Sequence, residues 1–430
     1  MRFFVYVLLL LVLAIADKHA VIMATADGWF NYSITSNPCR AYDDFVKMGV
    51  PPENIIFMMY SSNLNYSKNP YPGKIFTDAA DNTDGDWAQY GCFEHIDYTA
   101  DKITKSTFLS ILSGDISKVS AELNIENPKV LKSGPDDNLF FYVMDHGDYG
   151  YFYVNDQGID RWAWKYAVNK LYKNQKYKYC VVFMEACYGG SMWATLPDNQ
   201  NMVVITSADD AHPADMSNCP PNDYIGDKHL DTCLAGLFDN SYLKYIEEHP
   251  DATINEVYEA VAKDVRKISD QGVSMWGDDD VADMKISDFL GSNLVSKKCT
   301  NEPKEQSVVP VPEVPLHLAK WAVIRAEKEN EEELLKQYQD LVYTRAKEEI
   351  ELMRLAVSIK GEQEANLLSS KQTTMFDGSC VEGLVYELVH QCGHTTSFTS
   401  KAMNILRGIC EGKTNPNVNW ENICLYDCLF

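Results

Sequence analysis

The chain has 430 residues, and its 62 Asp and Glu side chains against 38 Lys and Arg give a formal net charge of −24. This balance argues against a nucleic-acid-binding protein, because a phosphate backbone requires a clustered basic surface. Hydrophobic residues make up 46% and charged residues 23%, which excludes global disorder. The length predicts two or three domains and leaves ample material for a core.

The N-terminus has the form of a secretory signal peptide. Arg2 precedes an apolar run from Val5 to Ala16, which ends in small residues typical of a cleavage site. The run of about 12 residues is too short for a helix to cross a bilayer core of ~30 Å. We therefore expect residues 1–16 to be removed, and we expect no membrane span in the mature protein.

The 12 cysteines fit a secretory route, because disulfides persist in oxidising compartments. The expected location is therefore secreted, lysosomal or vacuolar. Several cysteines crowd the C-terminal end and predict a small stapled module there: Cys380, Cys392, Cys410, Cys424 and Cys428.

Strands and helices are expected to alternate along the first 290 residues. Short apolar runs predict strands at Ala20–Ala24, Ile55–Tyr60, Leu139–Met144, Cys180–Met184 and Met202–Thr206. Apolar residues at helical spacing predict helices at Cys39–Met48, Thr104–Ser113 and Arg161–Tyr172. This order favours an α/β fold with a mostly parallel sheet and flanking helices, in which chemistry gathers beyond the carboxyl ends of the strands.

The composition changes after this region. Residues from Lys297 to Pro315 are polar and rich in proline, which predicts an exposed connector. Leu318–Lys360 is almost free of Gly and Pro and has helical spacing, with Glu331–Glu333 suited to the first turn of a helix. The cysteine-rich module follows from Asp377 to Phe430.

A histidine and a cysteine stand directly after two consecutive predicted strands. Leu139–Met144 leads into Asp145-His146-Gly147, and Cys180–Met184 leads into Glu185-Ala186-Cys187. Adjacent parallel strands would bring His146 and Cys187 together, where the imidazole can accept the thiol proton. A buried structural thiol and an ordinary loop histidine are the alternatives for each residue alone, and their joint placement favours a nucleophile.

Motifs for other chemistry are missing from the sequence. Residues 1–378 contain no CxxC or HxxxH spacing, which argues against a metal site. No P-loop is present and no GxGxxG follows a strand, so we expect no nucleotide cofactor.

A series of motifs occurs in order over the first 200 residues. They are Asp27–Tyr32, Met58–Tyr60, Asn69-Pro70, Pro72-Gly73, Asp97–Thr99, Val130–Pro135, Asp145–Gly147, Glu185–Cys187 and Leu196–Asn199. In these motifs the sequence resembles the legumain family, the asparaginyl endopeptidases. The resemblance implies a caspase-like α/β fold, synthesis as a zymogen, protein and peptide substrates, and activity in an acidic endolysosomal or vacuolar compartment.

The resemblance also implies roles for individual residues. Cys187 would be the nucleophile, His146 the general base and acid, and Asn31 the residue that orients the histidine. The N–H groups of Gly147 and Cys187 would form the oxyanion hole. Asp145 matches a position that can become a succinimide and is associated with peptide-ligase activity.

The expected specificity pocket departs from the family pattern. Ser33 and Ile34 occupy the positions of an Arg-His pair whose arginine binds the substrate Asn side chain. Glu185 and Asp227 match acidic pocket residues, and Asp215 lies where the family has Ser or Tyr. A pocket with carboxylates and no guanidinium should bind a cation better than a carbonyl, so we expect a changed Asn preference, toward basic or other side chains.

Two sequons and one cleavage position complete the expected site residues. Asn31 and Asn65 each begin an N-glycosylation sequon, and Asn65 is the expected glycosylation site because Asn31 should be buried beside His146. Asn330 lies near the position where legumains cut themselves during maturation.

The resemblance divides the chain into a catalytic domain at 17–290, an activation peptide at 291–333 and a helical prodomain at 334–430. The prodomain would cover the active site as an intramolecular inhibitor until acid loosens it. It would contain the disulfides Cys380–Cys410 and Cys392–Cys424. Residues 301–430 carry 13 basic and 20 acidic side chains, so the expected prodomain is not a simple basic cap on an acidic enzyme.

Two alternative functions remain open from the sequence. One is a peptide ligase or transpeptidase on the same fold, in which an amine resolves the thioacyl intermediate. The other is a protein-binding relative whose catalytic residues are idle. A relative of the GPI-anchor transamidase is disfavoured because the sequence has no C-terminal membrane helix.

Overall fold

The computed structural model describes residues 16–78, 85–155, 157–194, 196, 199–293, 306–361, 363, 378–392 and 403–411. Almost all of the expected signal peptide at 1–16 lies outside these ranges. The centre of the molecule is a seven-stranded sheet in the order β14-β9-β8-β4-β1-β2-β3. Its strands are β1 (Lys18–Ala24), β2 (Ile55–Met59), β3 (Tyr98–Thr99), β4 (Asn138–Met144), β8 (Tyr179–Glu185), β9 (Met202–Thr206) and β14 (Ser274–Gly277).

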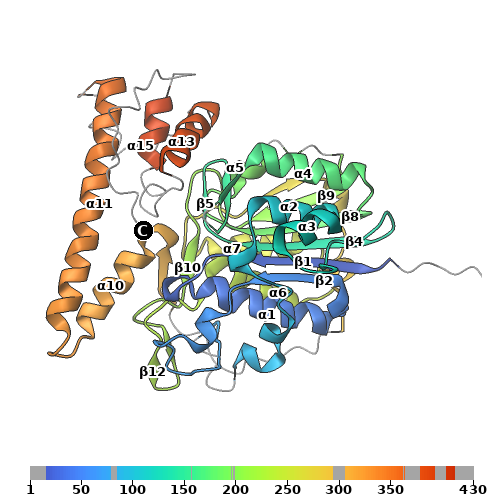
Figure 1. Ribbon diagram of the computed structural model, residues 1–430, viewed down its shortest axis with the longest axis horizontal. Coiled ribbons are helices and arrows are strands. Elements are labelled where there is room, and N and C mark those ends of the chain that lie inside the picture. The colour runs from blue at the N-terminus through green and yellow to red at the C-terminus, as the bar shows by residue number, and fades with distance from the viewer. Residues whose placement is uncertain are drawn as a thin grey trace, which may run out of the picture.

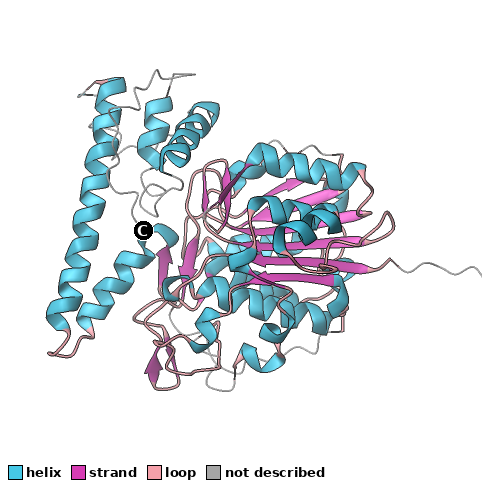
Figure 2. Cartoon of the chain, viewed as in Figure 1, coloured by secondary structure: helices cyan, strands magenta, loops and turns pink. Residues whose placement is uncertain are grey.

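All neighbouring strands of this sheet are parallel, except that β14 runs antiparallel to β9. The four central strands are almost wholly buried because helices cover both faces of the sheet (Figure 2). Buried parallel strands read as continuous apolar runs, which is why the sequence predicted them. The five strands expected from the sequence are β1, β2, β4, β8 and β9, and all five predictions are confirmed.

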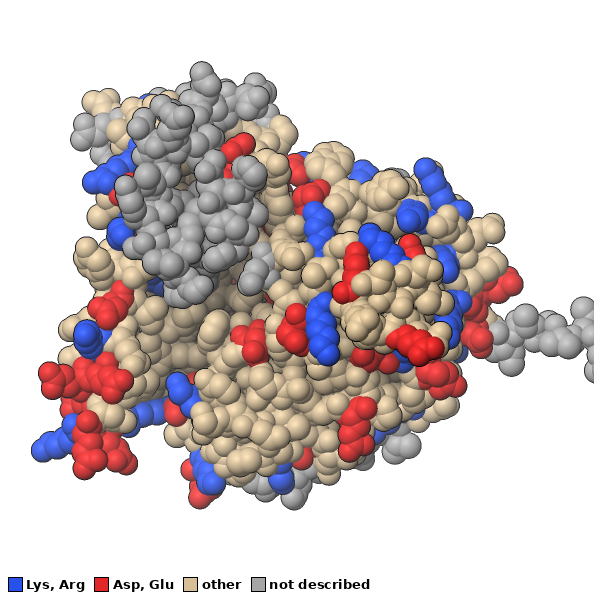
Figure 3. All heavy atoms as spheres, in the orientation of Figure 1, with Lys and Arg blue, Asp and Glu red and all other residues tan. Residues whose placement is uncertain are grey.

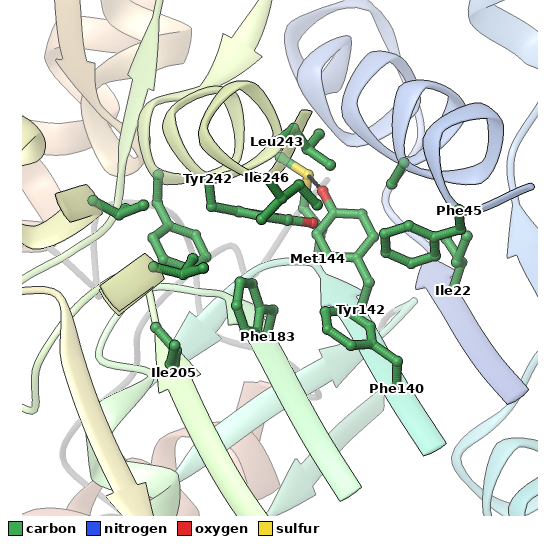
Figure 4. Close-up of a cluster of buried hydrophobic side chains, with 14 of the residues drawn as sticks. Ile22, Phe45, Phe140, Tyr142, Met144, Phe183, Ile205, Tyr242, Leu243 and Ile246 are labelled. Atoms are coloured by element: carbon green, nitrogen blue, oxygen red, sulfur yellow. Dashed lines mark hydrogen bonds between the residues drawn. The ribbon is translucent and has the colours of Figure 1, made fainter. Parts of the chain in front are cut away.

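Successive side chains of each strand point to opposite faces of the sheet and belong to two separate apolar layers. One layer packs against α1 (Ser33–Met48), α6 (Leu237–Glu248), α7 (Ile254–Val265), α8 (Asp279–Ala282) and α9 (Ile286–Leu290). In this layer Tyr142 and Phe183 of the sheet face Tyr242 of α6, and the rings of Phe183 and Tyr242 are 4.7 Å apart (Figure 4). The other layer packs against α2 (Lys105–Ser113), α3 (Ile116–Leu123), α4 (Arg161–Lys173) and α5 (Gly190–Trp193).

The expected α/β class with a mostly parallel sheet and flanking helices is confirmed. The helices expected at Cys39–Met48, Thr104–Ser113 and Arg161–Tyr172 are α1, α2 and α4. We call the part of the chain up to residue 293 the catalytic unit. Its smaller sheets are β5 (Gly147–Asp148), β6 (Tyr151–Val154) and β7 (Gln157–Asp160), the pair β11 (Tyr224–Ile225) and β12 (Lys228–His229), and a three-stranded sheet described next.

A segment expected to be an exposed connector is instead built into the fold. β15 (Val308–Pro310) pairs antiparallel with β10 (Asp215–Ser217), whose other edge pairs with β13 (Ala235–Gly236). Val309 is only 5% exposed. The prediction of a connector from Lys297 to Pro315 is therefore wrong for this part, because its valines supply β-branched side chains to a sheet edge while its prolines dominate the composition.

Helices form the C-terminal part of the described chain, at one end of the catalytic unit (Figure 1). α10 (Val314–Ile324) is followed by a turn and by α11 (Glu331–Lys360), which begins at the acidic run expected to start a helix. α13 (Gly378–Cys392) and α15 (Met403–Cys410) complete this part, and we call α11, α13 and α15 the cap. We call residues 306–326 the strap.

Disulfides tie both parts of the molecule. The expected Cys380–Cys410 bond joins α13 to α15. Two further bonds, Cys39–Cys92 and Cys219–Cys233, lie in the catalytic unit. Cys424, the expected partner of Cys392, lies outside the described residues. Within the described ranges, no helix combines the length and the apolar composition needed to cross a bilayer.

Candidate active site

His146 lies in the loop after β4, and the side chain of Asn31 orients its imidazole ring. Asn31 lies in the short 3-10 helix Trp29–Asn31, and its Oδ1 is 3.0 Å from His146 Nε2. Asn31 Nδ2 donates to the carbonyl of Asp27 at 2.7 Å. Because the amide nitrogen is engaged in this way, Oδ1 is free to accept, and His146 Nε2 carries the proton. The other ring nitrogen, Nδ1, is then the basic one.

The carboxylate of Asp145 fixes the backbone next to the histidine. It accepts the N–H of His146 at 2.7 Å and the N–H of Thr25 at 2.9 Å. It also accepts the hydroxyl of Thr25, whose oxygen accepts the N–H of Asn155. Three donors from two strand ends therefore hold Asp145, the succinimide candidate, in place.

The loop after β8 places Cys187 at a tight turn into α5. Tyr188 has a φ of 55°, which is unusual for a residue with a side chain. A Cβ on Gly189 would lie 3.1 Å from the carbonyl oxygen of Ala186, and one on Gly190 would lie 2.9 Å from the backbone of Asp209. A side chain at position 190 would force the backbone to shift, and one at position 189 would be in tight contact, so close backbone packing favours glycine at both positions.

The two loops are in direct contact. Met144 pairs with Glu185 at the ends of β4 and β8, and the N–H of Asp145 donates to the carbonyl of Glu185 at 3.1 Å. A Cβ on Gly147 would lie 2.5 Å from the carbonyl oxygen of Cys187. The structure therefore brings the loops that carry His146 and Cys187 into contact, with the backbones of Gly147 and Cys187 next to each other.

Burial keeps both reactive groups neutral in this closed form. Burial raises the pKa of the Cys187 thiol, and the nearby charges of Asp148, Glu185 and Asp215 raise it further, while the Ala214 backbone partly offsets them. Burial lowers the pKa of His146 to about 4. A neutral thiol beside a neutral imidazole is the resting state that general-base activation starts from.

A pair of buried carboxyl groups lies behind the nucleophile. Glu185 and Asp239 are at most 1% exposed, and their carboxylate oxygens form no hydrogen bond of good geometry among the described residues, although Ser207 approaches Glu185 and Tyr142 approaches Asp239. Burial raises the pKa of Asp239 to about 8, and it raises the pKa of Glu185 well above its usual range, an effect that the charges of Asp239 and Asp215 increase.

The other expected pocket residues are placed differently from one another. Asp215 is buried on β10, where Ser269 donates to it, and burial raises its pKa. Ser33 donates to the sulfur of Met216 at 2.9 Å, and Ile34 belongs to the apolar core. Asp227 is exposed in the turn between β11 and β12, whereas Glu185 is buried.

The cap covers this site with apolar side chains. Cys187, Tyr188 and Ala214 share one buried cluster with residues of all three cap helices, including Leu352, Leu355, Val381, Leu384, Leu406 and Ile409. Arg407 of α15 is 2% exposed and donates to the carbonyls of Asp210 and Ala211. Its guanidinium also lies over the rings of Tyr188 and Tyr149, at 5.2 Å and 5.8 Å from their centres.

Three residues of this arrangement were missed by sequence reasoning. Thr25 follows the first predicted strand directly, so the rule that located His146 could have located it. Asp239 lies inside α6 and Arg407 inside the cysteine-rich module, and no local pattern marks either one. Their positions depend on tertiary packing.

The remaining expected positions lie outside this site. Asn65 is exposed on the 3-10 helix Ser62–Asn65, and Asn330 is exposed at the N-terminus of α11. Asp17, His19 and Asp137 offer ligand atoms within 4.8 Å of one another at the start of β1, the end of the strand opposite Thr25.

Comparisons with known proteins agree with this geometry. A model of the Peptidase C13 family matches residues 18–292. The chain is similar to a hemoglobinase from Schistosoma mansoni, with 28% identity over 382 residues, covering 87% of this chain and 83% of that protein. It is similar to legumain from Homo sapiens, with 27% identity over 427 residues, covering 95% of this chain and 93% of that protein.

Two further matches extend this comparison. The vacuolar-processing enzyme delta-isozyme from Arabidopsis thaliana is 28% identical over 415 residues, covering 91% of this chain and 86% of that protein. Among solved structures, caspase-1 from Spodoptera frugiperda matches with a TM-score of 0.35 and 10% sequence identity, covering 61% of this chain and 88% of that chain.

Proposed function

This chain belongs to the Peptidase C13 family and is a legumain-type cysteine endopeptidase, and from that premise we propose that it is a zymogen whose Cys187 cleaves peptide bonds once the cap is removed. Neither a ligase nor an idle binding protein is favoured by any observation on this chain. The contact between the His146 and Cys187 loops is the observation that carries the proposal.

The reaction follows from the orientation of the histidine. Nδ1 of His146 takes the thiol proton, and the sulfur of Cys187 attacks the substrate carbonyl carbon. The N–H groups of Gly147 and Cys187 hold the oxyanion as charge develops on it. The imidazolium then protonates the leaving amine, and a water activated by His146 hydrolyses the thioacyl-enzyme and restores the thiol.

The cap acts as the inhibitor of this site. Its apolar side chains and the Cys187 loop form one buried cluster, so a substrate cannot reach the sulfur while the cap is docked. The guanidinium of Arg407 closes the same entrance over Tyr188. The cap therefore competes directly with substrate for the mouth of the site.

Acid favours opening through the catalytic histidine itself. His146 has a pKa of about 4 in the closed form because burial disfavours its charge, against 6.5 for a free histidine. An open state in which His146 regains contact with water would bind this proton more readily, and such opening is favoured increasingly as pH falls from 6.5 toward 4. This supports activation in an acidic compartment, reached through the secretory route and consistent with the disulfides of the chain.

The turn between α10 and α11 is the proposed activation site. Asn330 lies exposed at this turn, and so do Glu327, Lys328 and Glu329. Acidic side chains gather at this tip of the molecule, away from the catalytic unit (Figure 3). A protease can reach this turn without any opening of the cap.

Asn65, exposed on the catalytic unit, is the proposed glycosylation site.

Substrate preference is proposed to differ from a strict choice of Asn. Glu185 and Asp215 lie close enough to Cys187 to perturb its pKa, and no Lys or Arg forms an ion pair with either one in the described part of the chain. The unpartnered oxygens of Glu185 would be satisfied by a substrate cation, which would also return its pKa toward the usual range. A basic P1 side chain fits this environment best.

Activated protein tested against fluorogenic peptides that differ only at P1 checks these proposals. We expect cleavage at acidic pH, faster after Lys or Arg than after Asn, and lost in Cys187→Ala. Cys180→Ala is the matched control, because Cys180 is also a free buried cysteine and lies within β8. Cleavage after Asn alone would contradict the proposed pocket, and activity in Cys187→Ala would contradict the nucleophile.

A further inference from the structure

A histidine and two aspartates meet at the amino ends of two central strands. Asp17 directly precedes β1, His19 is the second residue of β1, and Asp137 directly precedes β4, which pairs with β1 in parallel. The ligand atoms of these three side chains lie within 4.8 Å of one another. Side chains two residues apart on an extended chain point the same way, so Asp17 and His19 both reach Asp137. This cluster lies at the opposite end of the sheet from the active site.

The imidazole of His19 is buried without a hydrogen bond. Its side chain is only 9% exposed, and Nε2 faces Oδ2 of Asp137 across 3.5 Å, which is beyond the usual range of an N–H···O bond. Within the described part of the chain, the ring of His19 neither donates nor accepts a hydrogen bond. Buried polar groups are normally satisfied, so this ring nitrogen points to a ligand between His19 and Asp137.

Asp137 is oriented by the turn that precedes β4. Its Oδ2 accepts the N–H of Gly134 at 2.8 Å, and its backbone N–H donates to the carbonyl of Gly134 at 3.2 Å. Carboxylates that bind metal ions are commonly oriented by a further hydrogen bond of this kind. No Lys or Arg in the described ranges forms an ion pair with Asp17 or Asp137, so no cationic side chain there offsets their charge.

Removal of the expected signal peptide adds a fourth donor to this cluster. Cleavage after Ala16 leaves an α-amino group on Asp17. The backbone nitrogen of Asp17 lies 3.1 Å from Oδ1 of Asp137. Neighbouring ligands of an ion with bonds of about 2.0–2.2 Å are separated by about 3 Å, so this nitrogen and Oδ1 are already spaced as two such ligands. The amine and the side-chain carboxylate of Asp17 can also close a chelate ring on one ion.

The donors match zinc better than calcium or magnesium. They are one imidazole, one amine and two carboxylates, and Zn²⁺ binds nitrogen and carboxylate oxygen, most often with four ligands in a tetrahedron. Ca²⁺ and Mg²⁺ prefer oxygen ligands. The sequence argued against a metal site because it lacks CxxC and HxxxH spacings in residues 1–378. Those spacings belong to turns and helices, and they do not register a site that two neighbouring strands build together.

We propose that Asp17, His19 and Asp137, together with the α-amino group of Asp17, bind one Zn²⁺ ion in the mature protein. This inference rests on the expected removal of residues 1–16 and does not depend on peptidase activity. The ion joins the start of β1 to the start of β4 and holds the mature N-terminus on the sheet. Only the folded chain brings Asp137 to the N-terminus, so binding stabilises the folded state.

The test uses the zymogen from Asp17 to Phe430, released from an N-terminal fusion by a protease that leaves no extra residue. The protein is freed of metal with a chelator and titrated with ZnCl₂ at neutral pH in a calorimeter. We expect one Zn²⁺ ion to bind per chain with a Kd on the order of 1 μM or below. The unfolding temperature should rise with the concentration of Zn²⁺. Co²⁺ in the same site should give the strong visible absorption of a tetrahedral complex.

Variants separate the four donors. Asp137→Asn and His19→Gln should each weaken Zn²⁺ binding by about 100-fold or more, because each removes a ligand and keeps a polar side chain of similar size. One glycine added before Asp17 moves the α-amine and should weaken binding about tenfold or more. Asp136→Asn changes an exposed neighbour outside the cluster, so it is the matched control and should bind Zn²⁺ as the wild type does. The unfolding temperature of each variant without Zn²⁺ distinguishes loss of a ligand from loss of the fold.

Three results would overturn the inference. The first is a wild-type zymogen that binds no Zn²⁺. The second is binding that Asp137→Asn leaves unchanged, because the ion is then held by the N-terminal tripeptide Asp17–His19 alone, through its backbone nitrogens. The third is N-terminal sequencing of the secreted protein that finds a first residue other than Asp17, which would then carry no α-amine. Binding is measured on the zymogen, so a failure of Cys187 in cleavage assays is distinguished from a failure of the metal site.

Discussion

The catalytic unit and the cap are stabilised in different ways. The catalytic unit has two apolar layers of its own, one on each face of the central sheet. The described helices of the cap have no separate layer, because their buried side chains belong to the cluster that also contains Cys187 and Tyr188. The cap therefore completes its core only by docking on the active site.

This difference couples the folding of the cap to inhibition. A cap that leaves the site must expose the apolar side chains of α11, α13 and α15 or repack them against one another. The catalytic unit loses no layer of its core in the same event. Variants that destabilise the cap should therefore open the active site more easily, whereas variants in the catalytic unit should change the rate of turnover.

The largest expected effect is on turnover alone. Gly147→Ala places a methyl group 2.5 Å from the carbonyl oxygen of Cys187 and moves one oxyanion donor. We expect kcat/KM of the activated enzyme to fall by about 10²–10³-fold, the usual cost of losing such a donor. The midpoint of cap release should not change. A variant that also releases its cap early would contradict the separation of the two regions.

Removing the disulfide of the cap should make the cap leave the active site more easily. In Cys380→Ser/Cys410→Ser the bond that closes a loop with a sequence separation of 30 is lost. Loop entropy predicts destabilisation of the cap by about 3–4 kcal/mol. Chemical denaturation followed by labelling of Cys187 should show early exposure of the thiol. The matched double variant Cys39→Ser/Cys92→Ser should instead destabilise the catalytic unit.

Two leucines of α11 distinguish the contribution of docking from the stability of the helix itself. Leu355 of α11 is 1% exposed, and Leu355→Ala should weaken the cap by about 3 kcal/mol through the cavity it leaves. Leu335→Ala on the same helix removes a side chain that is 40% exposed and should cost less than about 0.5 kcal/mol. Equal effects of the two variants on hydrogen exchange in the cap would contradict the shared core.

The smallest expected effect concerns an ion pair between the two regions. Glu382 of α13 lies 2.5 Å from Arg161 of α4, yet burial raises the pKa of Glu382 despite the opposing charge of Arg161. The carboxyl group of Glu382 thus binds a proton more tightly when the cap is docked than when it has left. The stabilisation of docking by protonated Glu382 is fully present below pH 4.5 and is lost as pH rises through the raised pKa of Glu382. Glu382 therefore opposes acid release.

Glu382→Gln tests that sign. Docking measured from pH 4 to 7 should weaken more steeply toward acid in the variant, with a change at neutral pH of less than about 1 kcal/mol because the pair is partly exposed. Arg354→Ala, which removes an exposed pair within α11, should leave the profile unchanged. Steeper acid release in Glu382→Gln agrees with the assignment, and shallower release contradicts it.

His146 and Cys187 could be predicted from the sequence because buried parallel strands are continuous apolar runs, and the residues at the ends of such runs are easy to identify. His146, Cys187 and Asn31 lie at or near such ends. Asp215 lies on β10, which is three residues long and carries no periodic signal, and Asp239 lies in the first turn of α6. Tertiary packing places both near Glu185, and Asp227, chosen by resemblance, lies in an exposed turn.

The strap was misjudged for a physical reason. Proline at Pro303, Pro310, Pro312 and Pro315 is typical of linkers, and composition gives no weight to the valines between them. A strand at a sheet edge tolerates proline where no ladder N–H is needed. The partner of this strand, β10, is distant in sequence and too short to predict, so the pairing was invisible from local patterns.

The position of Asn31 has a consequence for biosynthesis. Ser33 makes Asn31 the acceptor of a glycosylation sequon, although the folded Asn31 is 7% exposed and engages Asp27 and His146. Its partner His146 is synthesised 115 residues later. On a secretory route, folding and the oligosaccharyltransferase thus compete for the same amide nitrogen, and only chains that escape modification can become active. The yield of enzyme is then set by the order of events during translation.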